Sequence, residues 1–237
     1  MGRVDGRNEK KYQSNRQLER QSAILACARE MIEADGYAGL TMRDLARRAG
    51  VAPATLYNLY GGKDDLIIAA IDEMLTSLGE RAIAAQVAPG IGALNLMTQL
   101  TAEHIRNNPE CAEAMTRALF NVRAGDPLVA GLFARGYPFR AHQLRIAQRD
   151  GNIAAEVDVD TIAKHLTGDG WGQMLLWIMG SFTLAESCIE QLRSQLMTLI
   201  SVTRGAVRER LEAQLHELGW EQGDLGRNAS ALANRSG

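Results

Sequence analysis

Apolar side chains recur at helical spacing along most of the chain, and no segment has the convincing apolar–polar alternation of a strand. The first helical segment covers residues 16–34. Its apolar face contains Ile24, Leu25, Ala28, Met31 and Ile32. Asp35-Gly36 follows, and glycine is favoured just beyond a helix C-terminus. The pattern predicts a first helix that ends at this dipeptide.

Two short helix patterns come next, on either side of Gly50. Thr41 and Asp44 have the spacing of a capping box, with aspartate in place of the commoner glutamate. The second helix should therefore begin after Thr41 and stop at Gly50. Pro53 suits the first turn of a third helix, which we expect to end near Leu59.

Long amphipathic segments fill the rest of the chain, and Lys63 opens the first of them. They are separated by glycine and proline, and we expect helices over 63–86, 91–107, 109–123, 127–149, 158–180 and 183–218. Pro138 lies inside one segment and should kink or split it. Both ends of the chain are polar, which is typical of disordered segments.

These patterns predict an all-α protein with a small N-terminal domain of short helices, followed by a larger helical domain. The expected parts are a disordered N-terminal arm over 1–15, a three-helix helix-turn-helix domain over 16–62, the larger domain over 63–218, and a disordered tail over 219–237.

The cysteines and the apolar runs indicate where in the cell the protein is expected. Cys27, Cys111 and Cys188 are odd in number and far apart, which favours free thiols in a reducing compartment. The N-terminus lacks the apolar stretch of a signal peptide, and the longest apolar run, 174–179, is too short to span a bilayer. We therefore expect a cytoplasmic protein.

Charge is distributed unevenly along the chain. Residues 1–63 contain 11 Lys and Arg and 7 Asp and Glu, a net charge of +4. Of the chain's 26 basic and 28 acidic residues, this leaves 15 and 21 in the remainder, a net charge of −6. A basic head on an acidic body suits a polyanion-binding domain attached to a domain with another task.

The short helices meet the requirements of a helix-turn-helix. Ala46 offers a small contact residue, Gly50 a turn, and Leu56 an apolar inner face, which leaves the second helix of the motif free to enter a major groove. Tyr57 and Asn58 can offer a hydroxyl and an amide to phosphates or base edges. The alternative interpretation is a tight three-helix corner that binds nothing.

Residues 16–66 resemble the N-terminal domain of the TetR family of bacterial transcriptional regulators. The motifs that carry the resemblance are G-x-x-x-x-T, A-x-x-x-G-V, T-L-Y and K-x-x-L, all present in order. The resemblance implies that DNA is contacted by Arg43, Pro53, Ala54, Thr55, Tyr57, Asn58 and Lys63. It implies packing roles for Leu45, Val51, Leu56 and Tyr60.

Two residues depart from the family pattern. Ala52 stands where the family often has serine, so the N-cap of the third helix and a phosphate contact are missing. Leu59 stands where a polar residue is common, so no phosphate contact is assigned to it.

For the larger domain the resemblance implies only a variable helical layout that binds a small molecule and dimerises. The candidates for an effector pocket are His104, Met115, Leu119, Phe120, Phe133, Tyr137, Trp171 and Met174. An apolar or aromatic effector would suit them, but they equally suit an ordinary core or a dimer interface. No histidine pair has the H-x-x-x-H spacing of a metal site, and no metal or cofactor is expected.

The last two long segments are adjacent, and in the family such a pair packs against its copy as a four-helix bundle. The apolar stripe that would form this interface contains Leu184, Ile189, Leu192, Leu196, Leu199 and Ile200. A stripe that faces the chain's own core would have the same pattern.

The function predicted from the sequence is a homodimeric repressor that a small effector releases from a pseudo-palindromic DNA operator. The alternatives are an activator, or a DNA-binding dimer controlled by a protein partner in place of an effector. An enzyme is not expected, because the chain has no P-loop, GxSxG, HExxH or dinucleotide fingerprint.

Overall fold

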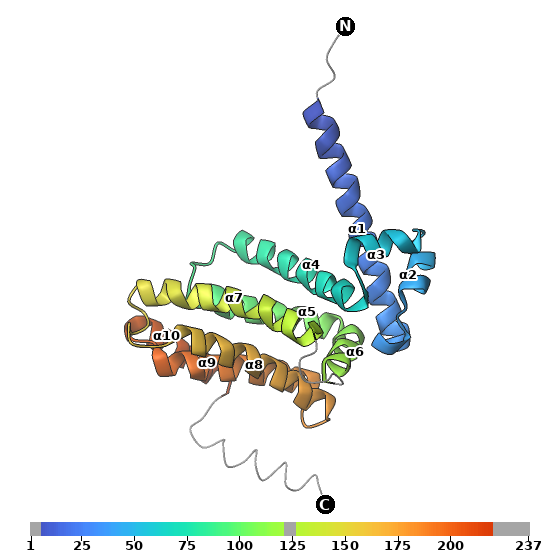
Figure 1. Cartoon of the computed structure of the whole chain (residues 1–237). Coiled ribbons are helices and arrows are strands. Elements are labelled where there is room, and N and C mark those ends of the chain that lie inside the picture. The colour runs from blue at the N-terminus through green and yellow to red at the C-terminus, as the bar shows by residue number, and fades with distance from the viewer. Residues whose placement is uncertain (1–5, 121–126, 220–237) are drawn as a thin grey trace, which may run out of the picture. The chain divides into compact units, whose positions relative to one another are not determined.

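The computed structural model describes residues 6–120 and 127–219 (Figure 1). Regular structure in these residues is helical, apart from one isolated antiparallel bridge between Ile153 and Thr203, so the predicted all-α class is confirmed. None of the described helices is long and apolar enough to cross a membrane.

The chain divides into two compact units. The first runs to Ser77 and also contains α6 from Glu110, whereas the second contains Leu78–Pro109 and the chain from Ala130 onward. This division falls inside α4 (Lys63–Ala84), between Ser77 and Leu78, and not at residue 62. The domain boundaries expected from the sequence stay a prediction.

The first unit begins with a long helix, which is kinked at Gly36, and continues with shorter helices. Its helices are α1 (Gly6–Gly39), α2 (Met42–Arg48), α3 (Pro53–Tyr60), the start of α4 (Lys63–Ala84), and α6 (Pro109–Phe120). Gly36 has φ 69°, so the expected end of the first helix is present as a kink inside α1. α1 begins at Gly6, which makes most of the expected N-terminal arm helical.

Each of the first four helices contributes a buried apolar side chain to this unit. Ile32 of α1 is 1% exposed, and Leu45 of α2, Leu56 of α3 and Leu66 of α4 are completely buried. Burial of each such side chain contributes about 1.5–3 kcal/mol. These apolar side chains therefore lie in the interior of the unit.

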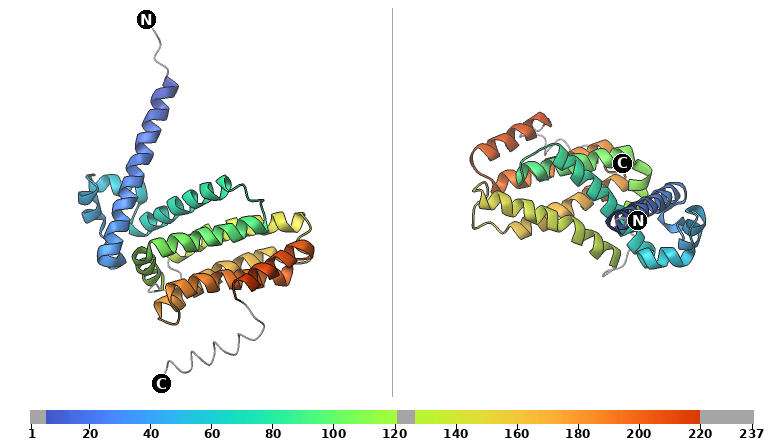
Figure 2. Two further views of the ribbon diagram at one scale, coloured as in Figure 1. Left: turned by 180° about the vertical axis from the view of Figure 1, so that it is seen from behind. Right: turned by 90° about the horizontal axis from the view of Figure 1, so that it is seen from above.

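The second unit is a helical bundle in which α9 is central. Its helices are α5 (Ile91–Asn107), α7 (Pro127–Arg149), α8 (Val159–Ile178), α9 (Leu184–Val202) and α10 (Gly205–Glu217). α9 packs against α5, α8 and α10, which Figure 2 shows from two further directions. α7 continues through Pro138, so the proline does not split this helix.

The segment 183–218 was expected to be one helix, and that prediction is wrong. Thr203 ends α9 in an extended conformation and forms the bridge with Ile153. The Arg204 N–H then donates to the Asn152 carbonyl at 3.0 Å. Gly205 begins α10 with φ 56°, a value that glycine adopts without strain. The chain thus pairs briefly with the α7–α8 connection before it becomes helical again.

Candidate nucleic-acid interface

The N-terminus of α2 is fixed by a local hydrogen-bond pair. Thr41 Oγ1 accepts from the Asp44 N–H at 3.1 Å, and the Thr41 hydroxyl donates to Asp44 Oδ2 at 2.7 Å. Asp44 also pairs with Arg47 at 2.8 Å. The first half of the expected capping box is therefore formed, while the carboxylate accepts from the threonine side chain.

The turn between α2 and α3 is a Schellman motif. The Val51 N–H donates to the Ala46 carbonyl at 3.0 Å, and the Gly50 N–H donates to the Arg47 carbonyl at 3.4 Å. Gly50 has φ 65°, in the left-handed region that favours glycine. This turn ends α2 at Arg48, and α3 begins soon afterwards at Pro53.

α3 buries one face and exposes its N-terminal half. Leu56 is fully buried and Tyr60 is 8% exposed, so both packing assignments hold. Tyr57 is 53% exposed, and its hydroxyl is available on the outer face. The other assigned residues of this helix are Pro53, Ala54 and Asn58, which are exposed, and Thr55, which is half-buried.

The start of α3 has the expected missing cap. Ala52 occupies the N-cap position with an extended backbone and offers no side-chain hydrogen bond. Backbone N–H groups at the start of a helix attract anions. Pro53 has no N–H, and the Thr55 N–H donates to the Ala52 carbonyl at 2.9 Å. The uncapped donor on the exposed side of this turn is therefore the Ala54 N–H.

Lys63 is held against an aromatic ring at the start of α4. Its Nζ lies 3.9 Å from the centre of the Tyr37 ring, and the Tyr37 hydroxyl donates to Asp64. Burial lowers the pKa of Lys63, while the neighbouring Asp64 carboxylate acts in the opposite direction. A half-buried ammonium group so positioned can contact a phosphate.

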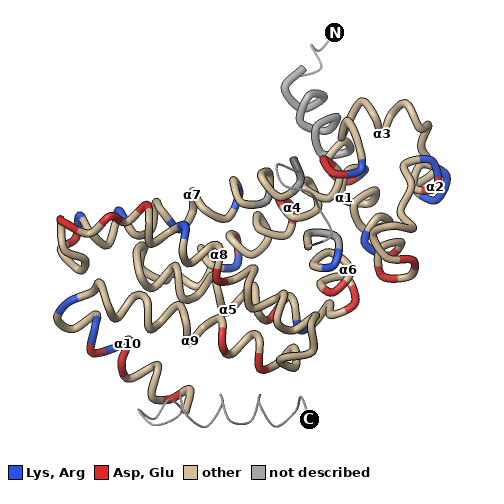
Figure 3. Tube along the Cα trace, turned by 60° about the horizontal axis from the view of Figure 1, so that its bottom comes forward, with Lys and Arg blue, Asp and Glu red and all other residues tan. Residues whose placement is uncertain are grey.

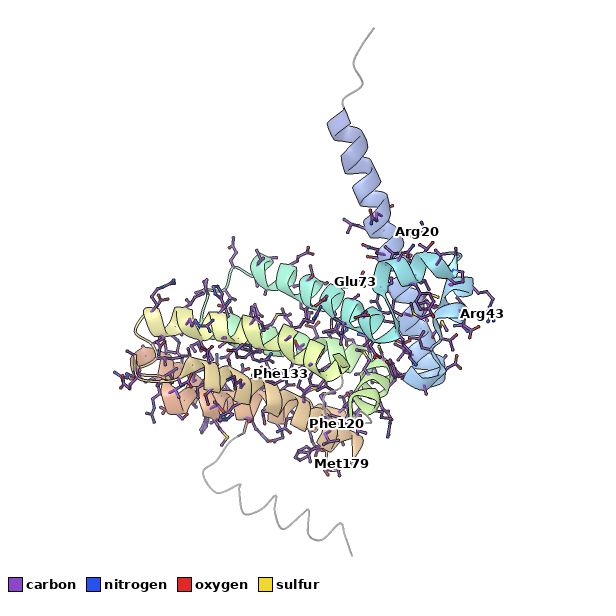
Figure 4. The ribbon with its side chains drawn as sticks, viewed as in Figure 1. Arg20, Arg43, Glu73, Phe120, Phe133 and Met179 are labelled. Atoms are coloured by element: carbon purple, nitrogen blue, oxygen red, sulfur yellow. The ribbon has the colours of Figure 1, made fainter. Side chains whose placement is uncertain are left out.

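Basic side chains collect on α2 beside these groups. Figure 3 shows the cluster of Lys and Arg positions on this helix, and Figure 4 shows Arg43 at its outer edge. Arg43, Arg47 and Arg48 are all exposed. Sequence reasoning selected only Arg43, and it also missed Tyr37, although the two adjacent arginines were a visible charge signal.

The predicted pocket residues do not all come together in one unit. Met115, Leu119 and Phe120 lie on α6 in the first unit, whereas the other five belong to the second. In the second unit the rings of Phe133 and Tyr137 stack with centroids 6.3 Å apart. Of the remaining three, Met174 is buried, and Trp171 and His104 are half-buried. The pocket stays a prediction.

The predicted dimer stripe is partly intramolecular. Leu196 and Leu199 are at most 1% exposed and belong to the core of the second unit, so they are unavailable to a second chain. Leu192 and Ile200 pack partly against the same core. Ile189 is 39% exposed. Leu184, the remaining residue of the stripe, is half-buried.

Comparison with known proteins supports the interpretation of the N-terminal unit. Residues 24–70 match the family model described as bacterial regulatory proteins, tetR family. The HTH-type transcriptional repressor KstR of Mycolicibacterium smegmatis is 32% identical over 113 residues, which cover 47% of this chain and 55% of KstR. The chain thus spans about half the length of this curated relative.

Solved structures share the fold over most of the chain. A putative TetR-family regulator from Syntrophomonas wolfei is 19% identical with a TM-score of 0.63, covering 78% of this chain and 96% of that one. Thermus thermophilus FadR, a TetR-family repressor in complex with lauroyl-CoA, is 21% identical with a TM-score of 0.59, covering 78% and 97%. The matched motif, the capped helix-turn-helix and this shared helical layout lead to one conclusion. In its helix-turn-helix segment, residues 24–70, the chain matches the tetR family of bacterial regulatory proteins.

Proposed function

We propose that this protein is a DNA-binding transcriptional repressor that acts as a homodimer and is released from its operator by a small effector. The observation that carries the proposal is the exposed N-terminal half of α3 above a buried inner face. A recognition helix needs this arrangement, because its first residues must reach base edges while its other face holds it on the domain.

The DNA contacts divide by chemistry. Tyr57 and Asn58 carry a hydroxyl and an amide on the exposed face of α3 and suit base edges in the major groove. Arg43 and Lys63 suit phosphates on either side of the groove. Each phosphate contact releases counterions, so affinity should fall steeply as salt rises.

A symmetric dimer explains how such a short helix obtains specificity. Two recognition helices about 34–36 Å apart read two half-sites one helical turn apart, so the operator should be a pseudo-palindrome. Ile189 and Met197 support α9 as part of the interface, because these large apolar side chains are 39% and 40% exposed.

An effector with an apolar part fits the second unit. The lauroyl-CoA complex of the Thermus protein supports this class, since that protein shares the fold. In this chain the stacked Phe133 and Tyr137 rings are the best-defined apolar surface among the candidates. The mechanism is a population shift between two arrangements of the dimer, with a coupling of about 1–3 kcal/mol.

The test is fluorescence anisotropy of the purified protein with the DNA upstream of its own coding region, at two salt concentrations. Scrambled duplex is the competitor, and Tyr57→Ala is the matched variant. Tight binding that resists competitor and weakens in Tyr57→Ala, with the dimer intact, supports the proposal. Equal, salt-erased binding to both duplexes contradicts sequence-specific regulation at this site.

A further inference from the structure

Arg140, in the second unit, has no charged partner among the residues that the structure describes. Arg140 lies on α7 as a half-buried residue, and desolvation of its guanidinium group lowers its pKa. Arginine nevertheless stays protonated in proteins, so the positive charge remains. A desolvated charge is costly unless an opposite charge and hydrogen bonds compensate for it.

Among the described residues, the Arg140 guanidinium group donates one hydrogen bond, and its acceptor lies on the same helix. Arg140 Nη1 donates to the Gly136 carbonyl at 3.2 Å, and within residues 6–120 and 127–219 no carboxylate lies at ion-pair distance from it. Asp160 of α8 contacts α7, but Tyr137 and Arg145 already donate to its Oδ1. Most donors of the Arg140 fork are therefore unused.

Gly136 makes room for the guanidinium group. A Cβ atom at this position would lie 3.1 Å from Arg140 Nη1 and 3.5 Å from Thr167 Cγ2 of α8. A side chain there would thus compete with the arginine for the space beside α8. The glycine keeps the cation next to the opposing helix.

Aromatic rings share this face of α7. Phe133, Tyr137 and Arg140 are spaced by four and three residues, which places them on one side of a helix. The first two rings stack on each other at 6.3 Å, and Figure 4 labels Phe133 on this helix. A cation that pairs with no described carboxylate therefore ends a short aromatic stripe.

We propose that Arg140 binds the oxyanion head of an effector, a carboxylate or a phosphate, whose apolar body packs along Phe133 and Tyr137. This inference rests on the proposed function, because it names the class of that effector. The guanidinium fork matches the two oxygens of such a head group with parallel hydrogen bonds. The bound anion compensates the charge that the described residues leave unpaired.

The proposal is tested by titration calorimetry of the full-length protein with three probes of one chain length. Octanoate and octyl phosphate carry the two kinds of oxyanion, and octanamide is the neutral match. The variants are Arg140→Met, Arg140→Lys and, as a control for loss of charge, Arg149→Met, whose side chain is 74% exposed on the same helix.

At least one anion should bind the wild type and Arg149→Met equally and more tightly than octanamide. Which anion does so separates a carboxylate from a phosphate ligand. Arg140→Met should lose about 10- to 100-fold in affinity for that anion, as expected for hydrogen bonds to a charged group. Arg140→Lys keeps the charge without the fork and should lie between the two. Octanamide should bind all four proteins alike.

Thermal unfolding without ligand separates this role from a structural one. Removal of an uncompensated charge should leave the melting temperature of Arg140→Met unchanged or raised, whereas a structural arginine would lower it. The proposal is overturned if neither anion binds, if octanamide binds as tightly as both, or if Arg140→Met and Arg140→Lys retain wild-type affinity for the anions.

Operator binding of the same proteins distinguishes this proposal from the function on which it rests. Arg140→Met should hold DNA like the wild type but resist release by the anion. If anion binding depends on Arg140 but the protein does not bind DNA specifically, only the proposed repressor function is contradicted. If the protein binds DNA specifically but its anion affinity does not depend on Arg140, only the proposed anion site is contradicted.

Discussion

Lys63 Nζ lies 3.9 Å from the centre of the Tyr37 ring, so the ammonium group at the start of α4 rests on the segment that follows the Gly36 kink. The same tyrosine donates its hydroxyl to Asp64, the residue next to Lys63. Tyr37 therefore contacts both Lys63 and Asp64, the first two residues of α4. A lysine side chain loses much conformational freedom when it binds a phosphate, and a cation already held on a ring loses less.

Replacement of Tyr37 by leucine should weaken operator binding by about two- to fivefold, because a cation–π contact of this kind contributes about 0.5–1 kcal/mol. Lys63→Ala should weaken binding more and reduce the slope of log affinity against log salt by about one. Anisotropy titrations over a series of salt concentrations measure both effects.

Tyr37→Phe is the matched control, because it keeps the ring and removes the hydroxyl. It should bind DNA nearly as well as the wild type. If Tyr37→Phe loses as much affinity as Tyr37→Leu, the hydrogen bond to Asp64 and not the ring positions the lysine.

Gly50→Ala and Gly79→Ala should change stability in opposite directions. Neither added Cβ meets an atom within 4 Å, so packing does not separate the two sites. Gly50 has φ 65°, where an L-residue costs about 1–2 kcal/mol. Gly79 lies inside α4 without a positive φ, where alanine gains about 0.5–1 kcal/mol. Chemical denaturation of both variants measures the difference, and destabilisation by Gly79→Ala would contradict a regular helix there.

The helix-turn-helix could be predicted closely because its signals are local. Thr41, Gly50, Pro53 and Gly61 each fix a backbone conformation through their own side chain or lack of one, and α2 and α3 begin and end within about a residue of expectation. The exposure of Tyr57 followed in the same way, since the buried face of a short amphipathic helix determines the opposite face.

Long-range partners account for what the sequence could not predict. Gln195 occupies a polar position on α9, yet it is 4% exposed because Thr98 donates to its carbonyl and its amide donates to Asn95. The break at Thr203 depends on Ile153, fifty residues earlier. Leu196 and Leu199 could equally have faced a second chain, and only the packing of α9 decided between the two.

Glu73→Gln should remove a stabilisation that exists only above acid pH. Burial alone raises the pKa of the Glu73 carboxyl, but hydrogen bonds from Arg29 and Ser22 outweigh it and hold the pKa below its ordinary value of 4.5. The Arg29 contact is 2.7 Å long and ties α1 to α4 (Figure 4 labels Glu73). A lowered carboxyl pKa stabilises the fold above the ordinary value, and this contribution is lost as pH falls through the lowered one.

Unfolding by urea at pH 7 and at successively lower pH checks this prediction. Wild type should exceed Glu73→Gln by about 0.5–1 kcal/mol at pH 7, since both side chains are about one-third exposed and solvent screens the pair. The difference should shrink as the pH falls below 4.5 and vanish once the pH lies below the lowered pKa of Glu73. Glu19→Gln, at an exposed position on α1, is the control and should follow the wild type throughout.

The exposed and buried halves of the α9 stripe should respond differently to substitution. Ile189→Lys places a charge where the side chain is 39% exposed, so the chain should fold normally while its dimer weakens. Leu196→Ala removes a side chain that is 1% exposed and should cost about 2–5 kcal/mol in unfolding free energy. Sedimentation velocity measures the oligomeric state, and urea denaturation measures the stability of each variant. An Ile189→Lys protein that sediments as the wild-type dimer would place the interface elsewhere, since a charge buried against a second chain should weaken the dimer.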